Sequence, residues 1–218
     1  MAQKNLDKYA NIPFGTLFAD KLNSNKANKG RTGQWVEERA GIKASSRLLD
    51  CEDGELKTFP KNDKGNPKET VAITQISKHI NDLYAGQKYE DSHLYEKTSK
   101  ICFTPIVKAD KDVRNWYIEK SFFYDANDPK FAQINADLEV DYYYICRKIR
   151  EYVDSGKNIH TISGKYLQIR TKDTRDKNGN YHPLYIEEVD RYVSNKNYAF
   201  FFKKQFMIDV EAIALSSN

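Results

Sequence analysis

Two acidic residues and a lysine lie close together in the first third of the chain. Asp50 is followed after four residues by Glu55, and Lys57 comes two residues later. The segment predicts a turn that enters a strand, in which Glu55 and Lys57 share a face while Leu56 points into the core. Two converging carboxylates suit a hard divalent cation, and a lysine beside them can orient or polarise a water molecule. This group of residues is the minimum needed for metal-dependent phosphodiester hydrolysis.

An ordinary explanation of the same pattern stays open. Charged residues make up 30% of the chain, so an acid two residues before a lysine recurs by chance. Asp53 also shares the strand face of Glu55 and Lys57, which makes it the rival of Asp50 as a metal ligand. Support for the pattern must therefore come from the elements around it.

Hydrophobic spacing predicts the elements that surround this strand. Residues 5–22 predict two short helical pieces, and residues 34–42 predict a helix that carries Glu37. The loop 60–67 leads into an alternating segment at 69–76, so the motif strand and this second strand are expected to pair as a hairpin.

The second half of the chain is dominated by one long amphipathic helix, expected at about 128–156. Strands are expected before and after it, at 100–107, 114–124, 165–171 and 198–206, with a polar turn at 173–183 and a final helix. The order is helices, a central mixed sheet, a long helix, strands and a helix. We therefore predict a mixed α/β fold in a single domain over residues 1–218.

Charge is distributed unevenly along the chain. Residues 157–204 contain ten Lys or Arg and five Asp or Glu, while the whole chain has a net charge of +4. A basic surface there fits a polyanionic partner, although a solvated face is the more common explanation for a run of charges.

The cysteines and the N-terminus indicate the compartment. Cys51, Cys102 and Cys146 are odd in number and widely spaced, which argues against a disulfide framework or a zinc site. The N-terminus lacks the apolar core of a signal peptide, and no apolar run is long enough to cross a membrane. We expect a soluble cytoplasmic protein.

Five segments in the same order resemble the MutH family, which comprises the mismatch-repair nicking endonuclease and related type II restriction endonucleases, several of which cut at GATC. The segments are KGRTGQWVEERAGI, GELKTFPKNDKGNPKET, DSHLYEKTSKICFTPIV, KYLQIRTK and FFFKKQF. The resemblance implies a PD-(D/E)xK nuclease core with Mg²⁺ as cofactor and two subdomains flanking a DNA cleft. The catalytic part would cover about 10–125 and the DNA-reading part about 126–218.

The resemblance also implies roles for individual residues. Asp50 and Glu55 match the metal-binding carboxylates, and Lys57 matches the active-site lysine. Glu37 matches a helix glutamate that completes the acidic cluster, and Lys97 matches a lysine near the scissile phosphate. On the residues alone, Glu37 is as well explained as a surface charge paired on its helix.

Arg170 and Lys172 match the residues that the family uses to read base edges in the major groove. An arginine can bond bidentately to guanine, whereas the plain alternative is that both side chains are solvated charges on an ordinary strand. Lys203 and Lys204 either clamp the DNA backbone or simply flank the start of a helix. For His93 we favour a hydrogen-bonded structural role over catalysis.

This sequence departs from the family pattern at three places. The repair enzyme has six residues between its aspartate and glutamate, whereas Asp50 and Glu55 have four between them, a spacing found in some relatives. Phe201 replaces the tyrosine that senses methylation of the target adenine, and Thr171 replaces a proline in the reading strand.

Three functions follow from these observations. The leading expectation is a type II restriction endonuclease that cuts a short palindromic DNA site, GATC, with Mg²⁺ and leaves 5′-phosphates. It would act as a monomer or as a homodimer on the palindrome. The alternatives are a mismatch-repair nicking endonuclease switched on by a MutL-type partner and a non-catalytic MutH-like DNA-binding domain.

Overall fold

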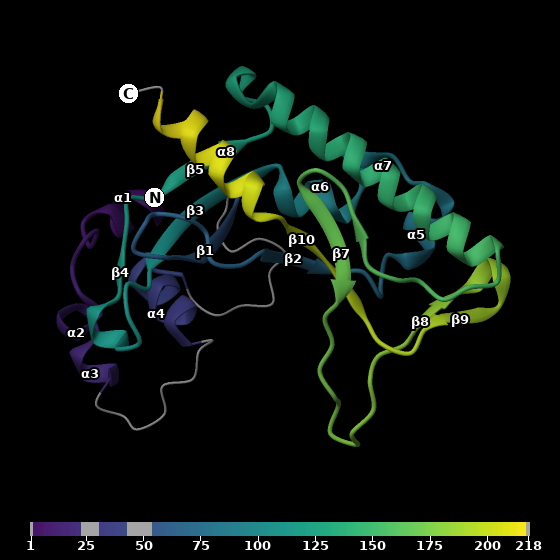
Figure 1. Cartoon of the computed structure of the whole chain (residues 1–218), viewed down its shortest axis with the longest axis horizontal. Coiled ribbons are helices and arrows are strands. Elements are labelled where there is room, and N and C mark those ends of the chain that lie inside the picture. Colours follow the sequence, from purple (N-terminus) through teal and green to yellow (C-terminus); the bar gives the residue numbers. More distant parts are fainter. Residues whose placement is uncertain (1, 23–30, 43–53, 217–218) are drawn as a thin grey trace. The chain divides into compact units, whose positions relative to one another are not determined.

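The computed structural model describes residues 2–22, 31–42 and 54–216. Their architecture is mixed α/β, and the chain divides into two compact units (Figure 1). The first unit comprises Met1–Glu69, Ser99–Asp128 and Ile208–Asn218, and the second comprises Thr70–Thr98 and Pro129–Met207. Each unit has a four-stranded sheet of its own.

The first unit is organised around strand β3. Its elements are α1 (Ala2–Asp7), α2 (Phe14–Leu17), α3 (Ala19–Leu22), α4 (Arg31–Arg39), β1 (Glu55–Lys61), β3 (Lys100–Val107), β4 (Tyr117–Ile118) and β5 (Phe122–Asp125). Strand β3 pairs in parallel with β1 and antiparallel with β4 and β5. Every β3 residue after Lys100 is buried, as expected for an apolar strand covered on both faces.

The two faces of β1 contact different parts of the core. Leu56 belongs to a cluster with Trp35 and Val36 of α4, whereas the Phe59 ring lies 6.0 Å from that of Phe103 and 6.2 Å from that of Phe122. Because both faces of β1 are buried, the register of the strand is fixed. The register in turn fixes the direction of the charged side chains of Glu55 and Lys57.

The second unit has an antiparallel sheet in the order β2-β10-β7-β6. Its elements are β2 (Val71–Gln75), α5 (Ile80–Ala85), α6 (His93–Thr98), α7 (Ala132–Asp154), β6 (Ile162–Ser163), β7 (Leu167–Thr171), β8 (Leu184–Ile186), β9 (Arg191–Ser194) and β10 (Tyr198–Phe202). Strands β8 and β9 form a separate two-stranded ladder. Helix α8 (Lys204–Leu215) begins in this unit, and its residues from Ile208 onward belong to the first.

The long helix predicted from hydrophobic spacing is confirmed. Helix α7 follows a 3₁₀ turn at Pro129–Phe131 and ends just before Gly156, which has a positive φ of 74°. The apolar side chains whose spacing predicts the helix are buried except for Tyr152, which is half-buried; they are Phe131, Ile134, Leu138, Tyr142, Ile145, Ile149 and Tyr152. Tyr142 in this set stacks on Phe200 of β10, so α7 covers one face of the sheet.

The predicted hairpin between β1 and β2 is wrong. Strand β1 pairs in parallel with β3, and β2 pairs with β10 in the sheet of the second unit. The loop between β1 and β2 closes with one bridge, Lys61 to Pro67, and Pro60 and Pro67 have no N–H with which to extend an antiparallel ladder. The expected single central sheet is thereby replaced by two sheets, and α5 and the β8–β9 ladder were not predicted.

Across the described ranges, no helix is both long and apolar enough to cross a membrane.

Candidate active site and nucleic-acid interface

Glu55 and Lys57 form an ion pair at the start of β1. The Glu55 side chain is 4% exposed, and its Oε1 accepts a hydrogen bond of 2.6 Å from Lys57 Nζ. The Lys57 side chain is 20% exposed, so its ammonium keeps contact with solvent. The predicted strand geometry is confirmed, because Glu55 and Lys57 meet on one side while Leu56 is buried in the core.

A glycine allows β1 to begin so close to β3. A Cβ added at Gly54 would lie 2.8 Å from the backbone oxygen of Lys100, which is closer than a real Cβ approaches such an atom. Glu55 comes next and pairs with Ile101. Glycine at position 54 therefore helps to fix the position of the Glu55 carboxylate.

The donor chemistry of Glu55 fits a hard divalent cation, since a carboxylate is the ligand that Mg²⁺ prefers in proteins. The two candidates for a second carboxylate, Asp50 and Asp53, lie outside the described residues. Among the residues that are described, no group of three or more His, Cys, Asp or Glu side chains is placed to hold a metal ion.

Helix α4 carries Glu37 and packs beside β1. A Cβ added at Gly33 of α4 would lie 3.2 Å from Thr58 Oγ1 of β1, so the helix backbone packs closely against a β1 side chain there. Glu37 is half-buried one turn further along the same helix. This packing agrees with the expected position of α4, whereas the catalytic role of Glu37 stays a prediction.

A second lysine of β1 has a different environment. Lys61 is 4% exposed, and its Nζ lies 2.7 Å from Glu119 Oε2 and 2.5 Å from Glu211 Oε1. Burial alone would lower the pKa of Lys61, but hydrogen bonds to the two carboxylates raise it. The role of Lys61 is not predictable from spacing, because both partners are distant in the chain.

Lys97 and His93 lie on α6 in the second unit. Lys97 is half-buried. His93 lies between Glu96 and Thr74, at 3.3 Å and 3.1 Å, and stacks on His79 with ring centroids 4.2 Å apart. Burial and the neighbouring His79 lower the pKa of His93. These contacts agree with a hydrogen-bonded structural histidine.

The reading residues expected on β7 gather around one aromatic ring. The guanidinium carbon of Arg170 lies 4.2 Å from the centre of the Phe201 ring, and Lys172 Nζ lies 5.8 Å from it. Arg170 Nη2 also donates to Thr70 Oγ1 at 2.9 Å. Arg170 and Lys172 are exposed, whereas Phe201 is 5% exposed. The cationic surface is therefore assembled from three separate parts of the chain.

The other residues expected to contact DNA differ in their surroundings. Thr171 and Lys204 are exposed, and Lys204 is the first residue of α8. Lys203 is half-buried, and its Nζ donates to the carbonyl oxygen of Gly164 at 2.7 Å. Lys203 thus has a structural bond within the protein, and Lys204 flanks a helix start.

Comparison with known proteins identifies the relatives of this chain. A family model described as DNA mismatch repair enzyme MutH matches residues 40–137. DNA mismatch repair protein MutH of Actinobacillus pleuropneumoniae serotype 3 is 25% identical over 193 residues, covering 85% of this chain and 78% of that protein. The MutH proteins of Haemophilus influenzae strain PittEE and Pasteurella multocida are 27% and 28% identical over 77% and 70% of this chain, and 75% and 66% of their own lengths. The chain is thus similar to MutH proteins over most of its length.

This similarity to MutH proteins agrees with the mixed α/β architecture, which fits a PD-(D/E)xK-like nuclease fold. The family-model match includes Asp50, Glu55, Lys57 and Lys97 but ends before β7. The pairwise match covers 85% of the chain. A match of that length must include β7, whichever residue it starts from. Similarity to MutH proteins therefore extends over β7, which carries Arg170, and over Lys172 directly after it.

Proposed function

We propose that this chain is a DNA endonuclease of the MutH type that hydrolyses a phosphodiester bond with Mg²⁺ as cofactor. The observation that carries the proposal is the 2.6 Å pair between the buried Glu55 carboxylate and the partly exposed Lys57 ammonium, on a strand that packs beside α4. A buried carboxylate next to an accessible cation suits a site where a metal and a phosphate meet.

In the proposed reaction a water oxygen bonds to phosphorus while the bond from phosphorus to the 3′ oxygen breaks, leaving a 3′-hydroxyl and a 5′-phosphate. Glu55 would hold the metal together with Asp50, or with Asp53 in its place. A bound Mg²⁺ would supply charge neutralisation at the phosphate and a lower pKa for the attacking water.

The chain's own groups would position the reactants. One N–H of the Lys57 ammonium is directed at Glu55, and its other donors suit the attacking water or a phosphate oxygen. Glu37 would add negative charge on the side of α4, and Lys97 would contact the scissile phosphate. The unit containing Glu55 would carry the chemistry, and the unit containing Arg170 would read the DNA.

We infer that the biological role is strand nicking in mismatch repair, since the matched relatives are all named DNA mismatch repair protein MutH. A MutL-type partner would then activate the enzyme. Arg170 and Lys172 would contact base edges of a short site, GATC, with Thr171, Lys203 and Lys204 along the backbone.

A second role is restriction of DNA at the same site by a monomer or a homodimer. The observation that favours it is Phe201, which lies beneath Arg170 where the family has a methylation-sensing tyrosine. A phenylalanine has no hydroxyl with which to distinguish a methylated adenine by a hydrogen bond.

Digestion of supercoiled plasmid by the purified protein tests these proposals. We expect Mg²⁺-dependent cutting of a plasmid that contains GATC, no cutting of a matched plasmid without GATC, and no cutting in EDTA. Open circles that accumulate only with a MutL-type partner would indicate nicking in repair, whereas linear DNA from the protein alone would indicate restriction. Absence of any cutting under all these conditions, with sequence-specific binding retained, would contradict the proposal of an endonuclease.

A further inference from the structure

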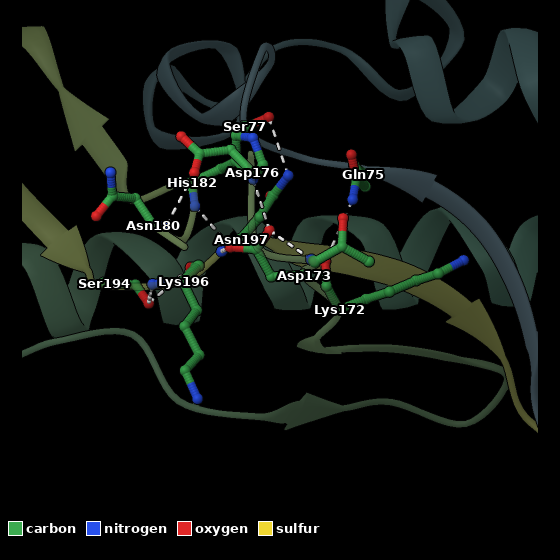
Figure 2. A network of polar contacts seen from close by, with 11 residues as sticks. Gln75, Ser77, Lys172, Asp173, Asp176, Asn180, His182, Ser194, Lys196 and Asn197 are labelled. Atoms are coloured by element: carbon green, nitrogen blue, oxygen red, sulfur yellow. Dashed lines mark hydrogen bonds and ion pairs between the residues drawn. The ribbon is translucent and has the colours of Figure 1, made fainter. Parts of the chain in front are cut away.

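Asp173 lies at the base of the loop that follows β7, directly after Lys172 (Figure 2). Its side chain is 1% exposed. One carboxylate oxygen accepts hydrogen bonds from Thr174 N and His182 Nδ1, and the other accepts them from His182 N and Asn197 N, all at 2.8 Å. Burial opposes ionisation of Asp173, but the N–H donors of Asn197 and His182 outweigh it and lower the pKa of this carboxyl.

The same network holds the backbone of Lys172 on both sides. Lys172 N donates to Asn197 O at 3.0 Å, and Lys172 O accepts from Gln75 Nε2 at 3.3 Å. Asn197 is 2% exposed, and its side chain donates to Ser77 Oγ at 3.1 Å. Asn197 therefore accepts from Lys172 through its carbonyl oxygen and donates to Asp173 through its N–H.

The opposite end of β7 has a similar anchor. Asp141 of α7 is 4% exposed and accepts hydrogen bonds from the backbone N–H groups of Lys165, Tyr166 and Leu167 at 2.6–2.8 Å. A Cβ added at Gly164 would lie 2.1 Å from Asp141 Oδ1, so this turn requires glycine. A buried carboxylate thus lies at each end of β7, and the one at Asp173, which bonds to Asn197 and to the following loop, is next to a reading residue.

We propose that Asp173 is a positioning residue for DNA recognition: its carboxylate fixes Asn197, to which the Lys172 backbone bonds, and the base of loop 173–182 in one geometry. The proposal rests on the function proposed above. When the backbone of Lys172 is held in place, its side chain contacts a particular base pair. When the backbone is not held, Lys172 keeps its charge but no longer contacts that base pair consistently.

The test compares sequence preference, because a loss of stability would weaken binding to every sequence alike. Duplexes with a randomised centre are selected for binding, in the absence of cleavage, by the wild type, Lys172→Ala and Asp173→Asn. We expect Asp173→Asn to lose about tenfold or more of the preference at the base pair that Lys172→Ala identifies, with the other positions unchanged. The substitution keeps the size of the side chain but turns an NH₂ group toward two N–H donors.

Asp176→Asn is the matched control. Asp176 accepts backbone hydrogen bonds from Asn178 and Asn180 within the same loop, at 2.8 Å and 2.9 Å, and is exposed. We expect this variant to select the same site as the wild type. His182→Ala removes one of the four donors to Asp173, and it should relax the same base pair less strongly, which keeps the test valid if Asp173→Asn does not fold.

Three results would overturn the proposal: unchanged preference in Asp173→Asn or in His182→Ala, equal weakening at all positions, or the same relaxation in Asp176→Asn. If the wild-type protein selects a site but does not cut DNA, the proposed endonuclease is refuted. The binding selections from randomised duplexes then still decide the role of Asp173.

Discussion

Two candidate functional side chains lie two residues apart at β1 (Glu55 and Lys57) and at the end of β7 (Arg170, and Lys172 directly after the strand), but the two places hold them in different ways. In β1 the partner of Lys57 is Glu55 of the same strand. In β7 the partners of Arg170 are Phe201 of the next strand and Thr70, a hundred residues away. The first arrangement places a cation against a carboxylate, which suits a metal and phosphate site, whereas the second places cations over an aromatic ring and leaves them exposed. Under the proposed function, the same spacing would serve hydrolysis in one unit and recognition in the other, because the neighbouring side chains differ.

The largest effect is expected from Lys57→Ala. Loss of the ammonium should lower the rate of DNA cleavage by about 10²–10⁴-fold, the range for removal of a catalytic group. Sequence-specific binding should persist, since Arg170 and Lys172 are untouched. Plasmid cleavage rates and fluorescence anisotropy with a duplex measure the two quantities. Full activity of this variant would refute the role of the Glu55–Lys57 pair.

Lys61→Met is the matched control in the same strand. Breaking the contacts to Glu119 and Glu211 should lower the free energy of unfolding by about 3 kcal/mol, the low end for a buried pair because both carboxylates keep some contact with water. Urea denaturation measures the loss. The folded variant should cut DNA at the wild-type rate. A loss of activity equal to that of Lys57→Ala would show that removing any lysine charge from β1 lowers cleavage, which would contradict a specific role of Lys57.

Arg170→Ala should have a smaller effect that is confined to recognition. We expect a loss of about 1–3 kcal/mol in binding to the specific site, with little change for unrelated DNA. Anisotropy titrations at fixed salt measure both affinities. Arg147→Ala, which removes an exposed arginine from α7 of the same unit, controls for net charge. Equal weakening of specific and unrelated DNA by Arg170→Ala would indicate a backbone contact instead.

The smallest effect concerns the protonation of His182. Its hydrogen bond to Asp173 raises the pKa of His182 above 6.5. The pair therefore stabilises the folded loop fully below pH 6.5, and this contribution is lost as the pH rises through the raised pKa. In Asp173→Asn the pKa should fall toward 6.5, as followed by NMR titration of the imidazole. Asp176→Asn should lower it less, and an equal fall in both variants would contradict the pairing.

Short-range patterns predicted the parts of the fold that depend on neighbouring residues. The alternation of Glu55, Leu56 and Lys57 correctly predicted which side chains share a face, since period two follows from strand geometry. The apolar spacing of α7 predicted a buried helix for the same kind of reason. The partner of β1 was not predictable in this way, because pairing with β3 joins residues that are 46 positions apart, such as Glu55 and Ile101.

The amino-acid sequence by itself determined the local chemistry of this protein: an acid and a lysine on one strand face, and a basic strand followed directly by Lys172. Tertiary structure alone decided which groups surround these residues. It set Phe201 beneath Arg170, and it placed Asn197 and His182 against Asp173. The physical reason is that a buried carboxylate takes its hydrogen-bond donors from whichever backbone the fold brings near it, and neither residue type nor spacing specifies that backbone.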